Sequence, residues 1–181
     1  KSDAIILALP MSAMAEVLQR AAEFMNPDAI IVSCAKGICF KKLEFTCDII
    51  KSVVPKNISA RACYLSGPSF ASELAQGLPT ALTLASDAKE SALDFQKRFS
   101  TENCRLYISD DVPGVCVGGA LKNVIAIAAG VCTALDLGHN ALASLITRGL
   151  REITRLGIAL GARYETFSGL SGVGDLLLSC T

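Results

Sequence analysis

The chain has 181 residues, and its 17 basic side chains balance 17 acidic ones, so the formal net charge is zero. This balance excludes the strong basic character of a general nucleic-acid binder and gives no reason to expect an anionic membrane surface as a partner. A hydrophobic fraction of 51% is that of a globular protein, and the length suffices for one domain with part of a second.

Up to residue 110 the chain alternates strand patterns with helix patterns. Unalternating apolar runs, which are typical of strands covered on both faces, predict strands at 3–9, 29–33, 62–66, 80–85 and 104–109. Helical periodicity predicts helices at 12–25, 43–54 and 89–99, and a short one ending at 75. Ser12 and Ser69 are expected to cap the first helix and the short one. The alternation predicts an α/β fold with a doubly wound, parallel sheet.

Beyond residue 110 only helix patterns remain, at 114–135, 140–161 and near 164–167 and 174–179. We therefore place a domain boundary at 109–112. The run from 112 to 135 is long enough to be considered as a membrane span, but Lys122 and Asn123 fall near its centre, where an ionised lysine is costly. We predict a tightly packed helix of a soluble domain and no membrane span.

The eight cysteines include no Cys-x-x-Cys pair, and His139 is the only histidine, so we predict no metal site. Several cysteines stand in apolar runs, where they act as small hydrophobic side chains, which favours a reducing compartment. His139 lies in a loop without a partner acid and is assigned no chemistry. The charged residues between 148 and 155 recur at helical spacing and predict a solvated, ion-paired face.

Lys122 is the single ionisable residue between 114 and 135. Its neighbours three and four positions away on a helix are glycine, isoleucine and alanine, so no carboxylate on the same helix can pair with it. Such a lysine must reach water, meet an acid from another element or face a ligand pocket. Burial lowers the pKa of a lysine, which suits a proton donor and acceptor near neutral pH. A snorkelling or structurally paired lysine is the alternative.

Polar groups also follow two of the predicted strands, where ligands of open α/β sheets bind. Lys36 precedes a glycine after the second strand and could face an anion, or it could be an ordinary loop lysine. Gly67 and Ser69 follow the third strand, where glycine allows a close backbone approach, or they form a plain capped turn. Asp175 in a first helical turn is explained by the helix dipole and by capping.

Taken together, these segments resemble the nicotinamide-dependent, soluble glycerol-3-phosphate dehydrogenases. The motifs occur in the family's order: Leu9-Pro10, Ala35-Lys36-Gly37, Ser66-Gly67-Pro68-Ser69-Phe70-Ala71, Gly118-Gly119-Ala120-Leu121-Lys122-Asn123, Thr147-Arg148-Gly149-Leu150 and Gly172-Val173-Gly174-Asp175-Leu176. Each motif is weak alone, whereas their order and spacing over most of the chain are specific.

The resemblance implies an oxidoreductase that transfers a hydride between NAD or NADP and carbon 2 of dihydroxyacetone phosphate, with sn-glycerol 3-phosphate as the reduced partner. It implies that Lys122 donates a proton to the carbonyl oxygen in reduction and accepts it in oxidation. Lys36 would be a second catalytic lysine between cofactor and substrate. The other residues carried over for the substrate are Gly67, Ser69, Asn123, Asp175 and Ser179, and those for the cofactor are Pro10, Lys36 and Ala71.

Two parts of the family pattern are expected outside this chain. The glycine-rich turn that cradles the pyrophosphate belongs before residue 1, and the Arg-Asn pair for the substrate phosphate belongs beyond residue 181. We expect residues 1–110 to be the later half of a Rossmann-type dinucleotide-binding domain and residues 111–181 the start of a helical substrate domain. The 181-residue piece alone is expected to be inactive.

The family implies a homodimer, and a cytoplasmic location with a plastid as the other choice. NAD and NADP are not distinguished, because the residue that reads the ribose belongs to the part of the sheet before residue 1.

Two alternatives remain open. The β-hydroxyacid and 6-phosphogluconate dehydrogenases also place a lysine on a helix after glycines, but they tend to carry asparagine four residues later, where this chain has Ala126. A truncated, non-catalytic relative that serves in assembly is the second alternative. It would have no need of three charged groups that converge on a pocket, namely Lys36, Lys122 and Asp175.

Overall fold

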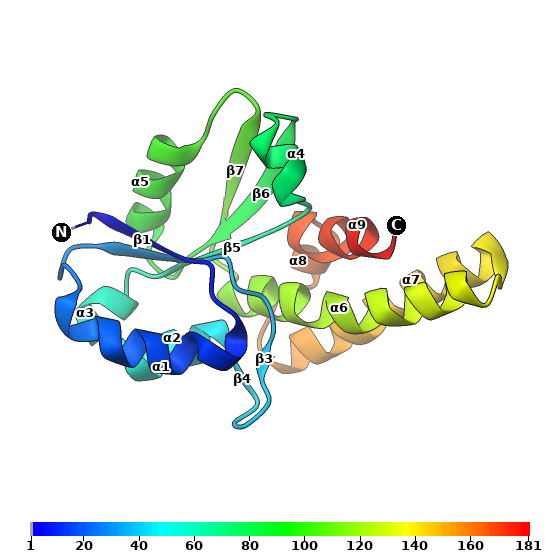
Figure 1. Cartoon of the computed structure of the whole chain (residues 1–181), viewed down its shortest axis with the longest axis horizontal. Coiled ribbons are helices and arrows are strands. Elements are labelled where there is room, and N and C mark those ends of the chain that lie inside the picture. Colours follow the sequence, from blue (N-terminus) through cyan, green and yellow to red (C-terminus); the bar gives the residue numbers. More distant parts are fainter. Residues whose placement is uncertain (1) are drawn as a thin grey trace.

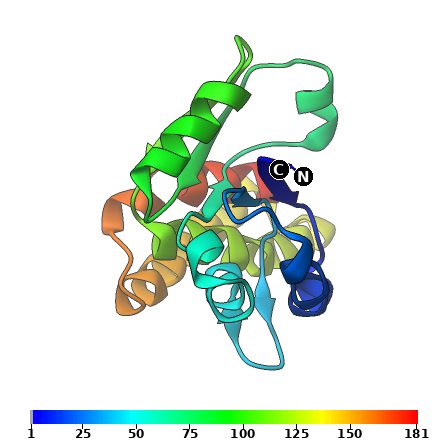
Figure 2. The same cartoon turned by 90° about the vertical axis from the view of Figure 1, so that its left-hand side faces the viewer.

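A computed structural model describes residues 2–181 as a sheet with helices on both faces and a helical part beside it (Figures 1 and 2). The main sheet has the order β1-β2-β5-β6-β7. Its strands are β1 (Ala4–Leu7), β2 (Ile30–Ser33), β5 (Cys63–Ser66), β6 (Thr80–Ala85) and β7 (Cys104–Ser109). A separate two-stranded hairpin consists of β3 (Ile38–Cys39) and β4 (Glu44–Phe45).

Eleven helical segments are described. Those of the sheet region are α1 (Met11–Ala21), the 3-10 turn η1 (Ala22–Phe24), α2 (Thr46–Val53), α3 (Lys56–Ser59), α4 (Ala71–Ala75) and α5 (Lys89–Phe99). Those of the helical part are α6 (Val112–Ala134), α7 (Gly138–Ala159), α8 (Tyr164–Phe167), the π-helical turn η2 (Leu170–Gly174) and α9 (Asp175–Cys180). Figure 1 shows α6 and α7 as a long antiparallel pair that projects from the sheet.

The sheet is covered on both faces, as its unalternating apolar strands require. One core cluster joins β-strand residues such as Ile31 to α1, α2, α3 and the start of α6. A second cluster joins Val32 and Leu84 to Phe95 of α5 on the opposite face. A third, in the helical part, includes Val117 of α6. The predicted α/β fold followed by helices is confirmed.

The prediction that all strands are parallel is wrong at one position. Strands β1, β2 and β5 are parallel, and so are β6 and β7, but β6 runs antiparallel to β5. The link between β5 and β6 carries only the short helix α4, which has no buried residue. A parallel return needs a crossover element packed on the sheet, and α4 does not pack there. Apolar strand patterns do not reveal strand direction.

Local details also differ from the predictions. The helix predicted at 43–54 begins at Thr46, since the residues before it form the β3-β4 hairpin, and α3 was not predicted. Neither predicted serine cap forms. Ser12 lies inside α1, where Pro10 is the N-cap residue, and Phe70 rather than Ser69 is the N-cap residue of α4. The Ser69 hydroxyl instead donates to the Gly67 carbonyl at 3.2 Å.

The start of α6 is tied to α8 by Asp111, which is 4% exposed. Its side chain accepts hydrogen bonds from the amides of Gly114 and Arg163, at 3.0 and 2.9 Å, and from the Thr166 hydroxyl. This carboxylate caps α6 and satisfies donors of a second segment, so it sets the direction in which α6 leaves the sheet.

Helix α6 is also the one described helix that length and composition would allow to cross a membrane. It packs between α7 and α9 and shares core clusters with the sheet helices, which is the position of a core helix.

Candidate active site

Lys122 finds its partner acid on another helix. Its Nζ donates to Asp175 Oδ1 at 2.5 Å and to the Ser179 hydroxyl at 2.9 Å, and its side chain is 13% exposed. Both partners belong to α9, which Leu176 anchors in the helical core cluster. Because α9 is packed on α6 by this apolar contact, its first-turn carboxylate faces the middle of α6. Of the three possibilities for Lys122, namely water, an acid from another element or a ligand pocket, the structure shows an acid from another helix.

Lys36 reaches the same carboxylate from the sheet. It stands in the loop after β2, and its Nζ donates to Asp175 Oδ2 at 2.5 Å and to the Gly67 carbonyl at 3.3 Å. Gly67 follows β5 with φ of +137°, a conformation that favours glycine, and its carbonyl accepts from both Lys36 and Ser69. The ends of two neighbouring strands, β2 and β5, therefore converge on the helical part at this point.

Asp175 is 1% exposed and accepts from three side chains. Besides the two lysines, the Ser66 hydroxyl donates to its Oδ2 at 3.2 Å. A buried carboxylate is stable only when it is paired and hydrogen-bonded, and this one has both. Two ammonium groups around one carboxylate leave the cluster with a net positive charge, so it favours an anionic ligand.

The pKa of Lys36 is lowered, first by burial and then by the nearby ammonium of Lys122, while Asp175 acts in the opposite direction. Two ammonium groups that lie close together disfavour each other's charge, which is the direction of the Lys122 contribution to the Lys36 pKa. A lysine with a lowered pKa gives up its proton more readily than a lysine in water, which suits acid-base chemistry.

The other residues carried over from the resemblance lie at varied distances from this cluster. Ser179 contacts Lys122 directly, whereas Ser69 is linked to Lys36 through the shared Gly67 carbonyl. Three more are exposed and make none of the hydrogen bonds that join the lysines to Asp175; they are Pro10, Ala71 and Asn123.

Ser66 was missed as a site residue. Sequence reasoning used it only as part of a motif, although its position at the last residue of a strand, beside a glycine, is the signal that could have selected it.

The space beside the cluster is small. A cavity of about 10 Å³ is lined by Lys36, Ser66 and Gly119, among others. The two lysine ammonium groups donate to Asp175.

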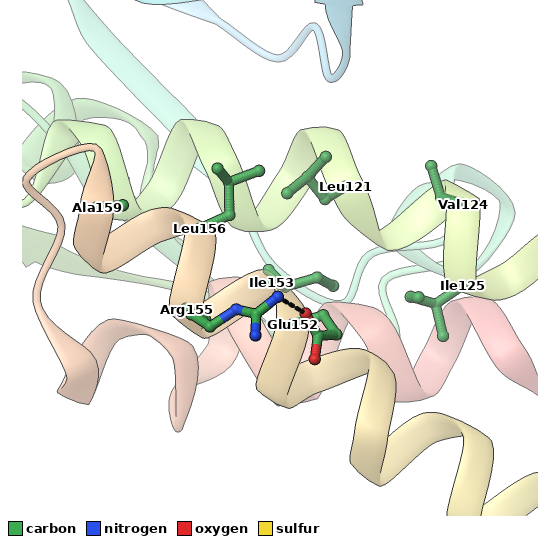
Figure 3. A pocket seen from close by; sticks show the side chains of 8 residues that line it. All are labelled: Leu121, Val124, Ile125, Glu152, Ile153, Arg155, Leu156 and Ala159. Atoms are coloured by element: carbon green, nitrogen blue, oxygen red, sulfur yellow. Dashed lines mark ion pairs between the residues drawn. The ribbon is translucent and has the colours of Figure 1, made fainter.

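A larger, apolar groove of about 430 Å³ lies between α6 and α7 (Figure 3). Its apolar lining comes from Leu121, Val124, Ile125, Ile153, Leu156 and Ala159. Glu152 and Arg155 at this groove are exposed and are paired with each other at 2.6 Å, as predicted for the charged face of this helix, whereas Arg148 and Arg151 form no ion pair among the described residues. No charged group of the lysine cluster lines the groove, so the two are separate features.

Among residues 2–181, no group of three or more histidine, cysteine or acidic side chains is arranged to hold a metal ion. The eight cysteines are all free thiols.

A Rossmann-type sheet joined to a helical part is an arrangement of dinucleotide-dependent dehydrogenases. The family model described as the N-terminus of NAD-dependent glycerol-3-phosphate dehydrogenase matches residues 1–92, and the model of its C-terminus matches residues 111–181. The chain belongs to the NAD-dependent glycerol-3-phosphate dehydrogenase family.

Individual relatives agree with the family models. The chain is 50% identical over 179 residues to glycerol-3-phosphate dehydrogenase [NAD(P)+] of Syntrophotalea carbinolica, a match covering 99% of this chain and 54% of that protein. It is 47% identical to the protein of the same name from Nitrosomonas eutropha, over 100% of this chain and 54% of that protein. The chain thus spans about half the length of the curated relatives it matches.

A crystal structure of glycerol-3-phosphate dehydrogenase from Coxiella burnetii superposes with a TM-score of 0.91 at 37% identity, covering 99% of this chain and 54% of that one. The resemblance drawn from the motifs is confirmed. The matches favour this family over the β-hydroxyacid and 6-phosphogluconate dehydrogenases.

Proposed function

We propose that the protein containing this chain interconverts dihydroxyacetone phosphate and sn-glycerol 3-phosphate with NAD or NADP. The observation that carries the proposal is the bridge of Asp175 between Lys122 and Lys36, two lysines from separate elements, in a chain of this family. A buried cluster with net positive charge fits a phosphorylated triose, which is a small anion.

In this proposal Lys122 is the proton donor to the carbonyl oxygen in reduction and the acceptor in oxidation. Asp175 and Ser179 hold its ammonium group in place, while Lys36 adds positive charge from the sheet side. The substrate contacts proposed besides these are Gly67, Ser69 and Asn123. Each ammonium can donate three hydrogen bonds and each lysine uses two of them, so each keeps one donor for an oxygen atom of the substrate.

The residues present fit a nicotinamide cofactor at the carboxyl ends of β1 and β2. Pro10 and Lys36 follow those two parallel strands, and Pro10 is exposed. Dinucleotides bind at such strand ends in doubly wound sheets. We propose Pro10, Lys36 and Ala71 as contacts of the cofactor, which when bound supplies or accepts the hydride.

We propose that residues 1–110 belong to the dinucleotide-binding domain and residues 111–181 to the helical substrate domain. The change from strands to helices after β7 supports this division. The cluster draws residues from both parts. Because the 181-residue chain spans only about half the length of its relatives, we expect it to be inactive alone.

For the whole protein we also propose a homodimer in the cytoplasm. The family resemblance supports the dimer, and the bacterial origin of the curated relatives supports the location. Sedimentation of the purified full-length protein at several concentrations tests the dimer, and a monomer at all of them would contradict it.

The central test is Lys122→Ala in the full-length protein. Turnover of dihydroxyacetone phosphate with NADH or NADPH is expected to fall by about 10²- to 10⁴-fold, the usual contribution of a positioned proton donor. Lys51→Ala is the matched control, since Lys51 is a lysine paired to Asp87 at the surface at 3.1 Å. Unchanged turnover in a folded Lys122→Ala protein would leave this lysine with a structural role and contradict the proposal.

A further inference from the structure

The hydroxyl of Ser66 is the one neutral donor to the side chain of Asp175 among the described residues. Ser66 is the last residue of β5 and is 3% exposed, and its Oγ lies 3.2 Å from Asp175 Oδ2. The residue comes from the sheet, whereas Asp175 opens helix α9. This hydrogen bond therefore joins the rigid sheet to the acid that both lysines share.

The two carboxylate oxygens of Asp175 have different partners. Oδ1 accepts from Lys122, and Oδ2 accepts from Lys36 and Ser66. The terminal torsion of an aspartate is broad, so the carboxylate plane can rotate. The two lysines are equivalent donors on long, flexible side chains and do not by themselves determine that plane. A serine hydroxyl on a short side chain at a strand end does, because it donates to one of the two oxygens, Oδ2, from a fixed position.

Helix α6 leaves room for the Ser66 hydroxyl at Gly119. A Cβ atom at Gly119 would lie 3.0 Å from Ser66 Oγ and 3.4 Å from Lys36 Cγ, which is tighter than ordinary packing. Helix α6 thus approaches the sheet closely at the point where the strand end meets the lysine cluster, and it does so one helical turn before Lys122.

We propose that Ser66 is a positioning residue, which holds the carboxylate of Asp175 in the orientation that assigns one oxygen to Lys122 and the other to Lys36. This inference rests on the proposed function, because it concerns how that site keeps its proton donor in place. Without the hydroxyl, the carboxylate turns and Lys122 loses the fixed acceptor that orients its ammonium group.

The kinetic test compares Ser66→Ala with Ser86→Ala in the full-length protein. Ser86 is the control, since it is 2% exposed and lies away from the lysines, where it donates to the Ala62 carbonyl at 2.7 Å and accepts from the Ala88 amide at 3.1 Å. For Ser66→Ala we expect kcat to fall about tenfold, the value of one hydrogen bond to a charged group, with KM changed less than about threefold. Ser86→Ala should keep the wild-type kcat.

A pH profile separates positioning from a merely structural role. Asp175 opposes the lowering of the Lys36 pKa, so a carboxylate that turns away lets that pKa fall further. The alkaline limb of the kcat/KM profile should therefore move to lower pH in Ser66→Ala and stay in place in Ser86→Ala. Wild-type kcat and an unmoved profile in a folded Ser66→Ala protein would overturn the proposal, as would an equal loss in Ser86→Ala.

If Ser66→Ala does not fold, Ser66→Cys replaces it, because a thiol has a similar shape but is a weak donor. The same loss of kcat is expected there, and full wild-type activity would overturn the proposal.

A double-mutant cycle in denaturant tests the contact without activity. Each single variant, Ser66→Ala and Asp175→Asn, is expected to raise the unfolding equilibrium constant by some factor. If Ser66 acts through Asp175, the double variant should raise this constant about tenfold less than the product of the two single factors. A product that is simply multiplicative would overturn the positioning role. Turnover of the wild-type protein tests the proposed function separately. If the wild type shows no turnover but the double-mutant cycle shows coupling between Ser66 and Asp175, the proposed function is rejected and the Ser66 contact is supported.

Discussion

On helix α6 a charged residue is more buried than two apolar residues, which is the reverse of the usual distribution. On one side Lys122 is 13% exposed, although it carries a charge. On the other, Val124 and Ile127 are 62% and 71% exposed, although they are apolar. The difference is that Lys122 faces the acid and hydroxyl of α9, whereas the two apolar residues have no described element packed over them. Burial along this helix follows the available partners rather than residue type.

Removing the carboxylate of Asp175, the partner of Lys122, should have the largest effect of the changes considered. Asp175→Asn takes the charge from between two ammonium groups, so we expect the full-length protein to lose about 3 kcal/mol of unfolding free energy. Turnover should fall by at least about a hundredfold, because Lys122 loses its orienting partner. Urea denaturation and steady-state kinetics measure the two quantities.

Asp87→Asn is the control for that substitution, since its pair with Lys51 is exposed on both sides. It should change stability by less than about 1 kcal/mol. Equal losses for the two aspartate substitutions would contradict the assignment of Asp175 to a buried functional cluster.

Two valines on the same helix sharpen the comparison. Val117 is 1% exposed and Val124 is 62% exposed. In the 181-residue chain, Val117→Ala should cost about 2 kcal/mol because it leaves a cavity in the core. Val124→Ala should cost less than about 0.5 kcal/mol. Thermal and urea unfolding measure both, and similar losses would mean that the Val124 side of α6 is covered as well.

Two glycines on α6 allow the effect of helix propensity to be measured apart from the effect of close packing against the sheet. A Cβ atom added at Gly130 would meet no other atom within 4 Å, whereas one added at Gly119 would lie 3.0 Å from Ser66 Oγ. Gly130→Ala should stabilise the protein by about 0.5–1 kcal/mol, since alanine is the better helix former. Gly119→Ala should forgo this gain and lower kcat several-fold. A stabilised, fully active Gly119→Ala protein would show that the close approach is not needed.

The smallest expected effect is a pH dependence of opposite sign at two lysines. The folded-state pKa of Lys36 lies below its ordinary value of 10.5, so the unfolded chain binds its proton more tightly. Stability due to Lys36 therefore rises with pH through the interval below 10.5. The pKa of Lys51 is raised by Asp87, so its contribution is present below 10.5 and is lost as pH rises above that value.

Urea midpoints of Lys36→Met and Lys51→Met, each compared with wild type across the alkaline range, measure these two contributions. Slopes of the same sign for the two lysines would contradict the difference in their surroundings.

Much of the sheet region was predictable because its patterns are local. Strands β6 and β7 and helix α5 were placed to the residue, since each is an apolar run or an amphipathic period bounded by polar turns. The family also followed from the order of short motifs. The direction of β6 relative to β5 could not be predicted, because β5 has the same apolar pattern whether its neighbour is parallel or antiparallel.

The candidate site was predictable only in part. The sequence indicated that Lys122 has no partner on its own helix, and it left open whether this lysine reaches water, meets an acid from another element or faces a ligand pocket. It did not identify the role of Ser66, since serine at a strand end is common and its partner is 109 residues away. The predicted caps at Ser12 and Ser69 failed because neighbouring proline and phenylalanine residues took the N-cap positions.

The amino-acid order by itself determined most of the elements, the change from sheet to helices and the unusual lysine in an apolar helix, because these depend on side chains within a few residues of one another. Only the tertiary structure decided which acid that lysine meets, since Asp175 is 53 positions away and is brought to it by the packing of α9 on α6. Long-range pairing depends on how apolar faces fit together, which no local pattern encodes.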